Sequence, residues 1–387
     1  MTDVYIGAAR RSPIGRLNGA LAGLSAAEIG AQVIAGMLSD ADVDPGAVDE
    51  VMLGQVLTGG AGQNPARQTS IGAGIPTRVP AMTLNMVCGA GQRSIHLAAQ
   101  AIRAEDAGLI VAGGQDSMSA APHVMHLRNP ARSGDRLACD TMVKDGLWDA
   151  FHDVHMGVTA EHLARRYRIS REDQDRFALA SQQKAARARD SGAFAEEIVA
   201  VQNGETLLAA DEHPKPDTTL SSLASMRPVF DSEGTVTAGN ASGLNDGAAA
   251  VLVGSANKLR MVGLEPMARI AGFASAALDP MDMGVGPAYA SRAALAKAGW
   301  RSDDLDILEI NEAFAAQALA VDLEMGWDPA RINPNGGAIA LGHPLAGSGA
   351  RIVVTLLHQM QRSGVRRGLA ALCIGGGQGV AICLERN

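Results

Sequence analysis

The sequence predicts an α/β protein built from two similar halves, with a large segment inserted in the first. Three observations predict this fold class. Short apolar segments of strand type alternate with segments that repeat apolar residues at helical spacing, which is typical of βαβ units with parallel strands. The second half of the chain repeats the order of elements seen in the first. Between the halves, residues 119–239 lose the alternation and become richer in His, Met, Asp, Arg and Pro.

The first half reads as alternating strands and helices. Ser25 is followed three positions later by Glu28, which is the capping-box pattern at the start of a helix. Each expected strand is short and apolar, as buried strands of an α/β sheet are. Strands are expected at residues 4–10, 48–54 and 108–114, and helices at 25–38, from residue 64 onward and at 93–102.

The inserted segment still contains two expected helices, at residues 159–167 and 170–191. Ser170 is the candidate N-cap of the second helix, and Asp173 lies in its first turn, where the helix dipole favours an acid. Residues 211–217 read as a loop. We expect a first half formed by residues 1–118 and about 240–268, an inserted loop domain at 119–239, and a second half at 269–387.

The repeat is visible in three places. A helix at 288–299 followed by a strand at 305–310 repeats the helix at 25–38 and the strand that follows it. A glycine-rich turn at 335–340, leading to a helix from Ser348, repeats the turn and helix around Cys88. The strand with glycines at 369–378 parallels residues 109–115. A site at the junction would be lined by both halves, where ligand pockets tend to form.

Composition narrows the class of protein. The chain has 387 residues, more than one ordinary core holds, and its 47% hydrophobic content excludes disorder. A net charge of −8 without any Lys/Arg-rich block argues against nucleic-acid binding. The four cysteines, at positions 88, 139, 373 and 383, form no Cys-x-x-Cys pair and are too few for a disulfide framework. Without a membrane-length apolar run or a signal segment, a cytoplasmic location is expected.

Cys88 stands between an apolar run at 82–87 and the expected helix at 93–102. Gly89 and Gly91 would permit a sharp turn of the backbone there. A thiol near a helix N-terminus meets free N–H groups and the helix dipole, both of which favour the nucleophilic thiolate. A small buried core cysteine is the other interpretation of this pattern taken alone.

Three further features align with Cys88 in the repeat. His343 stands between Gly and Pro in a glycine-rich loop, where it is a candidate base or hydrogen-bond donor to a thiolate. A loop histidine without a catalytic function is the alternative. Cys373 ends an expected strand and precedes a run of glycines whose N–H groups are open to an oxyanion; a packed strand end is the alternative. The dinucleotide spacing G-x-G-x-x-G is absent. Asn311 follows an expected strand. Its side chain would either hold a water molecule or cap the next helix, and the sequence favours neither.

Four motifs in this order resemble the thiolase family, most closely the biosynthetic acetoacetyl-CoA thiolases. They are Asn-Met-Val-Cys-Gly-Ala-Gly at 85–91, Asn-Glu-Ala-Phe at 311–314, Gly-His-Pro at 342–344 and Cys-Ile-Gly-Gly-Gly-Gln-Gly at 373–379. The resemblance covers nearly the whole chain, including residues 236–248. It implies the thiolase fold: duplicated βαβαβ-type halves that form a layered α/β/α/β/α core, with a loop domain inserted in the first half.

The resemblance also implies a role for each motif. Cys88 would accept the acyl group, and His343 would activate it and bind a thioester oxygen together with a water held by Asn311. Cys373 would take a proton from the methyl group of a second acetyl-CoA, and the N–H groups of Cys88 and Gly375 would form an oxyanion hole. The implied reaction is the reversible Claisen condensation of two acetyl-CoA to acetoacetyl-CoA and CoA, with ping-pong kinetics. Two thiols and an imidazole run it without a metal or a cofactor, since the CoA thioesters are substrates.

The same resemblance implies contacts with coenzyme A, mostly from the inserted segment, and a homo-oligomer, either a dimer or a tetramer made of two dimers. Ordinary core packing, or a loop hydrogen bond for a serine, is the alternative for several of these residues. The implied binding residues are His155, Met156, Lys215, Ser222, Phe230, Ala238, Ser242, Met283 and Phe314.

The chain departs from close relatives at a few positions. Gln92 and Ser94 replace the usual Leu and Ala, and Leu-Ala-Gly-Ser at 345–348 replaces Ile-Gly-Ala-Ser. Lys215 stands where biosynthetic enzymes often carry an arginine near the adenine. Because an ammonium stacks on a base less well than a planar guanidinium does, we expect a weaker or redirected adenine contact.

Three other functions are weighed against this one. A degradative 3-ketoacyl-CoA thiolase would accept longer chains; His155, Met156 and the full inserted loop favour the short substrate. A decarboxylating ketoacyl synthase of the same fold lacks a second catalytic cysteine, so Cys373 argues against it. A catalytically silent acyl-CoA binder remains open because fold alone does not fix function, but intact Cys88, His343 and Cys373 argue for an enzyme.

Overall fold

The computed structural model describes residues 2–128 and 134–386 and is built around one mixed sheet. Its strands are β1 (Val4–Arg11), β3 (Glu50–Gly54), β4 (Ala81–Leu84), β5 (Leu109–Ser117), β12 (Asn245–Ser255), β13 (Ala268–Ala277), β14 (Ile307–Ile310), β15 (Arg367–Ile374) and β16 (Gln378–Glu385). They lie in the order β14-β15-β16-β13-β1-β12-β5-β3-β4, and the short β2 (Gly15–Arg16) pairs with β12. The order confirms the predicted duplication, because β1, β12, β5 and β3 correspond to β13, β16, β15 and β14 on either side of the middle.

The sheet is parallel only in its outer parts. β3 pairs in parallel with β4 and β5, and β14 pairs in parallel with β15, as the βαβ pattern predicted. The inner neighbours are antiparallel, which the alternation of elements alone did not predict. The reason is local: β15 and β16 are joined by a tight glycine turn, which can only connect antiparallel strands. At the seam, the two halves meet through two residue pairs, Tyr5 with Arg269 and Ile6 with Ala268.

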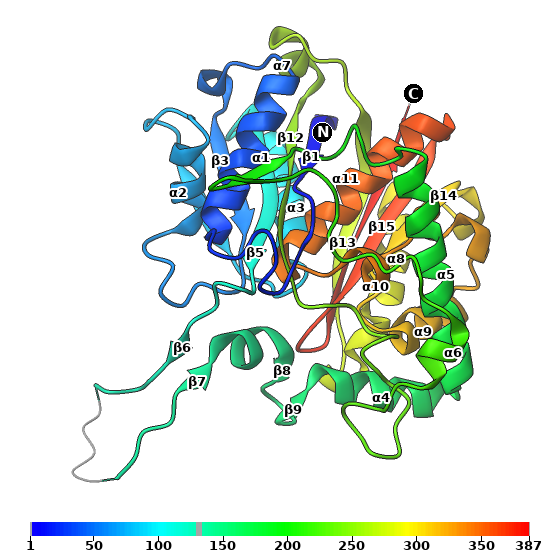
Figure 1. Cartoon of the computed structure of the whole chain (residues 1–387). Coiled ribbons are helices and arrows are strands. Elements are labelled where there is room, and N and C mark those ends of the chain that lie inside the picture. The colour runs from blue at the N-terminus through cyan, green and yellow to red at the C-terminus, as the bar shows by residue number, and fades with distance from the viewer. Residues whose placement is uncertain (1, 129–133, 387) are drawn as a thin grey trace.

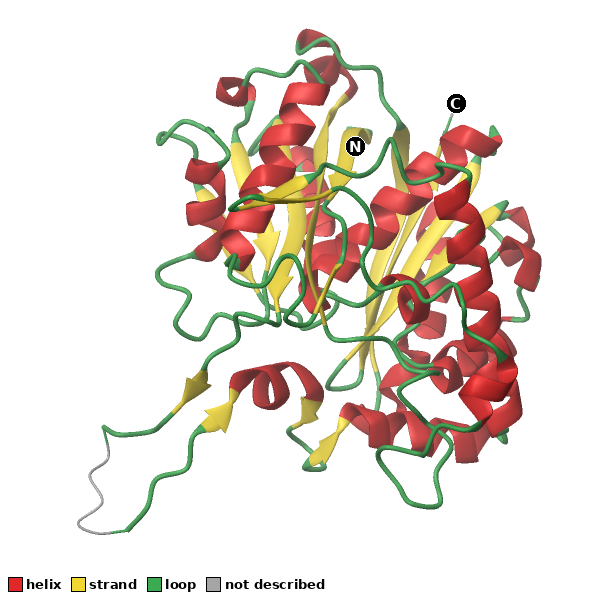
Figure 2. Cartoon of the chain, in the orientation of Figure 1, coloured by secondary structure: helices red, strands yellow, loops and turns green. Residues whose placement is uncertain are grey.

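Helices cover the strands in layers (Figure 2). α3 (Ala90–Arg103) and α11 (Leu345–Ser363) share one hydrophobic core with strands of both halves and form the middle layer. α1 (Ala26–Asp40) and α2 (Pro65–Gly72) cover the other face of the first half, and α8 (Gly286–Ala298) and α9 (Ala315–Met325) cover that of the second. The predicted α/β/α/β/α core is therefore confirmed. No helix in the described part of the chain has the length and apolar character needed to cross a membrane.

After β5 the chain leaves the sheet and rejoins it at β12 (Figure 1). The intervening residues first extend outward as β6 (His123–Val124) and β7 (Cys139–Asp140), and then pass through a single π-helical turn at Met142–Leu147. Two helices of this segment, α4 (Met156–Tyr167) and α5 (Arg171–Asp190), pack against α9 of the second half. The other strands and α-helices of the described residues are β8 (Trp148–Asp149), β9 (Val154–His155), β10 (Val201–Asn203), β11 (Thr206–Leu208), α6 (Leu220–Ala224), α7 (Ala256–Met261) and α10 (Ala338–Leu341).

The predicted helix starts agree with the capping chemistry. Ser25 caps α1 through a complete capping box with Glu28, and Ser170 caps α5 through the same arrangement with Asp173. In each box the serine side chain accepts a backbone N–H while the acid accepts the N–H of the cap, so two otherwise unpaired donors are satisfied. α11 differs from expectation, because it begins at Leu345 rather than at Ser348.

Glycines let the first turns of α3 and α11 touch. A Cβ added at Gly91 would collide with the carbonyl oxygen of Ala346, and one added at Gly349 would lie 2.7 Å from the backbone nitrogen of Gln92. This differs from the expected role of Gly89 and Gly91 in the turn before α3. The residue with positive φ in that turn is Val87, at 45°, whereas neither glycine has a positive φ.

A buried arginine ties the inserted segment to the sheet. Arg11 of β1 is fully buried; its Nε lies 2.6 Å from Oε1 of Glu197 and its Nη1 lies 2.6 Å from Oδ1 of Asp211. Both acids belong to the inserted segment. Glu197 also accepts a hydrogen bond from the Thr355 hydroxyl of α11, at 3.1 Å. Removing one member of such a group leaves an unpaired buried charge, so these contacts fix how the segment lies on the core.

His96 is a buried polar residue of the middle layer. It lies on α3 and stacks on Phe273 of β13, with 4.6 Å between ring centroids. Among the described residues, neither of its ring nitrogens has a hydrogen-bond partner. Burial lowers the pKa of His96 to about 3, so the ring stays neutral in the folded protein well below the pH at which it protonates in the unfolded chain.

We expect His96→Leu to flatten the loss of stability in acid. A histidine with an unfolded pKa of about 6.5 and a folded pKa near 3 removes about 2 kcal/mol of stability between about pH 7.5 and pH 5, since protons bind the unfolded state there. Urea titrations of wild type and variant at both pH values measure this difference. If the free energies of unfolding of the two proteins differ by the same amount at both pH values, His96 is not a neutral, unpartnered histidine in the folded protein.

Candidate active site

A cavity of about 340 Å³ opens where the two halves and the inserted segment meet. It brings together most of the residues predicted from the sequence, including Cys88 from the first half and His343 and Cys373 from the second. The predicted residues in its lining are Cys88, His155, Met156, Phe230, Ala238, Ser242, Met283, Phe314, His343, Cys373 and Gly375. Lining residues that the sequence did not single out include Met118, Met142, Val143, Leu147, Leu244 and Leu345.

Cys88 follows a strained residue and precedes a helix. Val87 has a φ of 45°, which a β-branched side chain rarely adopts, and α3 begins two residues after Cys88 with Gly89 as its N-cap. Burial raises the pKa of Cys88 to about 11; hydrogen bonds from the backbone N–H groups of Gly375 and of Cys88 itself oppose the rise, and the charge of Asp116 adds to it. The expected preference for the thiolate at this helix end is thus present but is outweighed by burial.

Cys373 ends β15 inside the same cavity. It is buried and pairs across the hairpin with Gly379. Burial, together with the charge of Cys88, raises the pKa of Cys373 above its ordinary range, so the two thiols are close enough to interact. The hairpin turns at Gly376 and Gly377, whose φ values are +83° and +78°. This turn is what carries the N–H of Gly375 toward the sulfur of Cys88.

His343 lies in the loop between α10 and α11, and hydrogen bonds fix both its backbone and its ring. Its N–H donates to Oδ1 of Asn245 at 2.9 Å, and its Nδ1 lies 2.5 Å from the Ser348 hydroxyl in the first turn of α11. Burial, with a contribution from the charge of Arg351, lowers the pKa of His343 to about 4. The imidazole is therefore neutral near pH 7 and, with Nδ1 engaged by Ser348, offers Nε2 as the site for proton exchange.

Asn311 follows β14 and is fully buried beside the strand that carries Cys373, since its N–H donates to the carbonyl of Ala371 at 3.0 Å. It does not cap α9, whose N-cap is Phe314, so the capping alternative is wrong. Among the described residues, neither polar atom of its side chain has a hydrogen-bond partner. Asn311 does not itself line the cavity, although Ala313 and Phe314 from the same loop do.

Aromatic rings and methionines form the rest of the wall. Phe230 stacks on His155 with 4.6 Å between centroids and meets Phe314 edge-on at 6.3 Å. His155 is also the N-cap of α4, where its Nδ1 accepts the N–H of Gly157. Met156 and Met283 are buried in the same apolar cluster as Cys373. A thioether wall of this kind adapts to small apolar groups.

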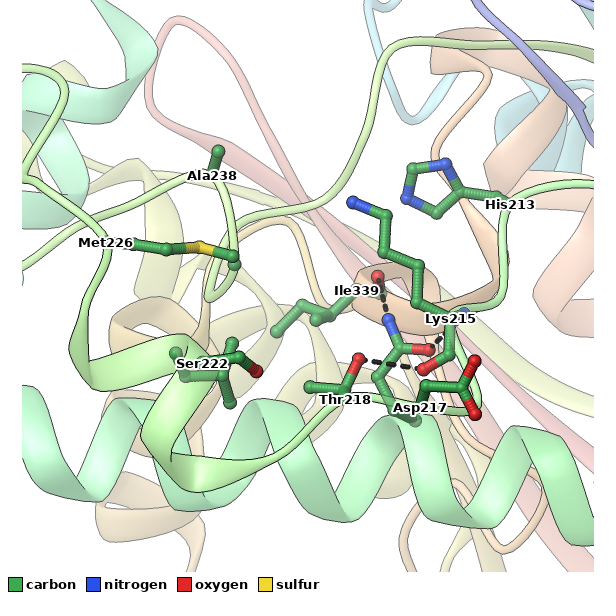
Figure 3. Close-up of a pocket in the computed structure, with 11 residues that line it drawn as sticks. His213, Lys215, Asp217, Thr218, Ser222, Met226, Ala238 and Ile339 are labelled. Carbon is green, nitrogen blue, oxygen red and sulfur yellow. Dashed lines mark hydrogen bonds between the residues drawn. The ribbon is translucent and has the colours of Figure 1, made fainter.

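Figure 3 shows a second hollow, of about 370 Å³, which adjoins the first because the two share a lining residue. Ala238 lines both, while Lys215 and Ser222 line only the second. The Lys215 side chain extends beside His213, and the Lys215 backbone N–H donates to Oε1 of Gln182 at 2.8 Å. The Ser222 hydroxyl is engaged in the capping box of α6. The predicted binding residues thus divide between two adjoining hollows, one around the thiols and one around Lys215.

Gln92 and Ser94, the two substituted residues on α3, form hydrogen bonds with backbone carbonyls. The Gln92 side chain donates to the carbonyl of Ala370 on β15, at 3.0 Å, and so links α3 to the second half. The Ser94 hydroxyl donates to the carbonyls of Gly91 and Gly113 at 2.7 and 2.8 Å. These hydrogen bonds satisfy the polar atoms of both side chains at the buried face of α3, apart from the Oε1 atom of Gln92.

The side chains and backbone N–H groups that meet in this cavity are suited to acyl transfer. A neutral imidazole and two thiols share a buried cavity, and backbone N–H groups point at one of the sulfurs. Sequence reasoning missed Asp116 and Asn245, although Asn245 lies inside a motif that carries the family resemblance. The signal that would have revealed them is their position at strand ends beside the candidate residues, since strand ends of an α/β sheet converge on the site.

We expect alkylation of Cys88 by iodoacetamide to accelerate about tenfold for each pH unit between about pH 7 and pH 10, because only the thiolate reacts and its pKa is about 11. Peptide mass spectrometry against time measures the rate, and Cys88→Ser identifies the modified site. A rate that is flat across neutral pH would instead mean a preformed thiolate–imidazolium pair with His343.

Comparison with known proteins agrees with this site. Residues 4–257 match the family described as "Thiolase, N-terminal domain", and residues 264–386 match "Thiolase, C-terminal domain". The chain is 57% identical to an acetyl-CoA acetyltransferase of Pseudomonas aeruginosa and 55% identical to one of Cupriavidus necator, in each case over the full length of both chains.

Two solved structures have the same fold. The Bacillus anthracis acetyl-CoA acetyltransferase superimposes with a TM-score of 0.97 at 42% identity, over 100% of this chain and 99% of the other. Human mitochondrial 3-ketoacyl-CoA thiolase in complex with CoA gives 0.96 at 40% identity, over 100% and 98%. By fold, sequence and the four motifs around its cavity, this chain belongs to the thiolase family.

Proposed function

We propose that the protein is an acetyl-CoA acetyltransferase that interconverts two acetyl-CoA with acetoacetyl-CoA and CoA. One observation carries the proposal: Cys88, His343 and Cys373, from opposite halves of the chain, line one cavity. Its full-length relatives named acetyl-CoA acetyltransferase support the short-chain reaction over that of a degradative 3-ketoacyl-CoA thiolase. A catalytically inactive acyl-CoA-binding protein would not need two thiols and an imidazole in the same cavity.

In the first half-reaction, the sulfur of Cys88 attacks the thioester carbonyl of acetyl-CoA while His343 takes the thiol proton. The lowered pKa of His343 supports this role, because a neutral imidazole can accept a proton at neutral pH. CoA leaves as the thiol with a proton from Cys373, which becomes a thiolate. His343 keeps the proton of Cys88, and the acetyl group remains on Cys88. The N–H groups of Gly375 and Cys88 lie at the sulfur, where they would stabilise the negative oxygen of the acyl intermediate.

In the second half-reaction, Cys373 as a thiolate takes a proton from the methyl group of a second acetyl-CoA. Burial raises the pKa of Cys373, and a thiolate there is a correspondingly strong base. The carbanion attacks the acetyl group, a carbon–carbon bond forms, and the thioester bond to Cys88 breaks. The released Cys88 thiolate takes back its proton from His343. His343, with a water held by Asn311, would bind the thioester oxygen; the unpartnered buried amide of Asn311 supports that role.

Coenzyme A would lie along both hollows. His155, Met156, Phe230, Ala238, Ser242, Met283 and Phe314 would contact the acyl and pantetheine end, and Lys215 and Ser222 the nucleotide end. Lys215 supplies positive charge to the second hollow. Burial lowers the pKa of His213 to about 4, and the charge of Lys215 adds to this effect.

We expect Lys215→Ala to raise KM for CoA about threefold to tenfold and to leave kcat nearly unchanged, because a single charged contact at a solvent-exposed site is worth about 1 kcal/mol. Initial rates of acetoacetyl-CoA thiolysis at varied CoA measure both constants. Arg176→Ala, which removes an exposed charge from α5, is the control. An unchanged KM would place the nucleotide away from Lys215.

The function is tested by thiolysis of a series of 3-ketoacyl-CoA substrates that begins with acetoacetyl-CoA. We expect kcat/KM to fall steeply beyond four carbons, because the buried side chains of Met156 and Met283 in the cavity wall would obstruct a longer acyl chain. Cys88→Ala should abolish turnover. A flat or rising profile would support the degradative thiolase, and full activity of Cys88→Ala would overturn the assignment.

We also propose that the enzyme needs no metal or cofactor, acts in the cytoplasm, and works as a dimer or a dimer of dimers. β4 supports the assembly, since it is an edge strand with partly exposed residues and unpaired edges invite pairing. The mass in solution, measured by light scattering, decides between a monomer and these assemblies.

A further inference from the structure

The backbone of the loop that carries His343 is strained, so neighbouring residues must stabilise its conformation. Gly342 has a φ of 107° and Leu345 a φ of 32°, so a residue with a side chain adopts the left-handed region two positions after the histidine. Such conformations persist only where the surroundings determine them. Both ends of this loop are in fact held by side chains of the first half of the chain.

Asn245, at the start of β12, holds the beginning of the loop. Its Oδ1 accepts the N–H of His343 at 2.9 Å, and its Nδ2 donates to the carbonyl of Gly15, also at 2.9 Å. The two partners fix which way the amide faces, because the N–H must meet the oxygen. Asn245 is fully buried, and a Cβ at Gly342 would collide with its side chain, so the loop lies directly on this amide.

The same amide adjoins the second hollow. Nδ2 of Asn245 lies 3.3 Å from Nδ1 of His213, a residue that lines the hollow with Lys215. The ring of His213 packs on Gly243, where any Cβ would collide with it. Asn245 therefore stands between the inserted segment and the loop of His343.

Asp116, near the end of β5, holds the other end of the loop. Its Oδ2 accepts the N–H of Ala346, in the first turn of α11, at 2.8 Å. Its Oδ1 accepts the N–H groups of Val56 and Leu57 at 3.1 and 2.9 Å. Asp116 is fully buried and all of these partners are donors, so the carboxylate joins the turn after β3 to the helix that follows His343.

We propose that Asn245 and Asp116 are positioning residues that hold the strained loop at both ends and so place the His343 imidazole for proton transfer with Cys88. The inference rests on the proposed function. It assigns to these two residues an effect on kcat rather than on substrate binding, since neither lines the cavity or the hollow. It also explains why the first half supplies buried polar groups at this point: they fix a base that belongs to the second half.

The first test compares Asp116→Asn with Asp246→Asn. Asn has nearly the same volume as Asp but replaces one acceptor by a donor, so either the Ala346 or the Leu57 N–H loses its partner. Asp246, on the neighbouring strand β12, is an equally buried carboxylate. It accepts hydrogen bonds from Ser117, Met118 and Ser119 and none from the His343 loop. Assays at about pH 8 keep Asp116 ionised, because burial raises its pKa to about 7.

We expect Asp116→Asn to lower kcat for acetoacetyl-CoA thiolysis about tenfold to hundredfold with KM for CoA within about twofold, the effect of a misplaced base. Asp246→Asn should keep kcat within about twofold while losing a similar amount of thermal stability. Alkylation of Cys88 should not slow in either variant, which shows that the nucleophile is intact. Equal losses of kcat in both variants, or none in Asp116→Asn, would overturn the proposal.

The second test uses Asn245 and remains decisive if Asp116→Asn does not fold. Asn245→Asp keeps the oxygen that accepts the His343 N–H but loses the donor to Gly15, whereas Asn245→Ala loses both. We expect kcat of Asn245→Asp to exceed that of Asn245→Ala about tenfold, even though both are less stable than wild type. Similar kcat values in the two variants would contradict positioning. Absence of thiolysis in the wild type would instead refute the proposed function, and is seen before any variant is made.

Discussion

The close contact between the first turns of α3 and α11 is the constraint on which the site depends. Gly91 and Gly349 allow this contact, because a side chain at either position would push the helices apart. Cys88 lies two residues before α3, and His343 lies two residues before α11. Contact between the helix starts therefore brings the two residues to one cavity. The five-layer core follows from the same geometry, with the helix pair buried between the sheet regions of both halves.

Burial then decides the protonation state of the reacting groups. In a low-dielectric cavity the charged form of each group is disfavoured, which raises the pKa of both thiols and lowers that of the imidazole. The resting site is therefore composed of neutral groups. In the proposed reaction, charge would develop only when a substrate is attacked. The N–H groups of Cys88 and Gly375, which contact the Cys88 sulfur, would then lie close to that charge. Preorganised dipoles of this kind need no rearrangement during the reaction.

The inserted segment completes the cavity but depends on the core for its position. Arg11 in the first strand binds Glu197 and Asp211 of the segment in a fully buried group, and Glu197 also receives the hydroxyl of Thr355 from α11. The segment thereby reaches the middle layer of the protein as well as the sheet. From this anchored frame it supplies His155, Met156 and Phe230 to the wall and Lys215 to the adjoining hollow.

The sequence by itself determined the duplicated α/β plan, the capped starts of α1 and α5, and the candidates Cys88, His343 and Cys373, because periodicity, capping and motifs are local patterns. It did not determine the antiparallel centre of the sheet, the strained Val87, the net shift of the Cys88 pKa, or the use of Asp116 and Asn245 at the His343 loop. Only the tertiary structure decided these features. Each depends on which distant segments become neighbours and how much water they exclude, and no single stretch of sequence records that.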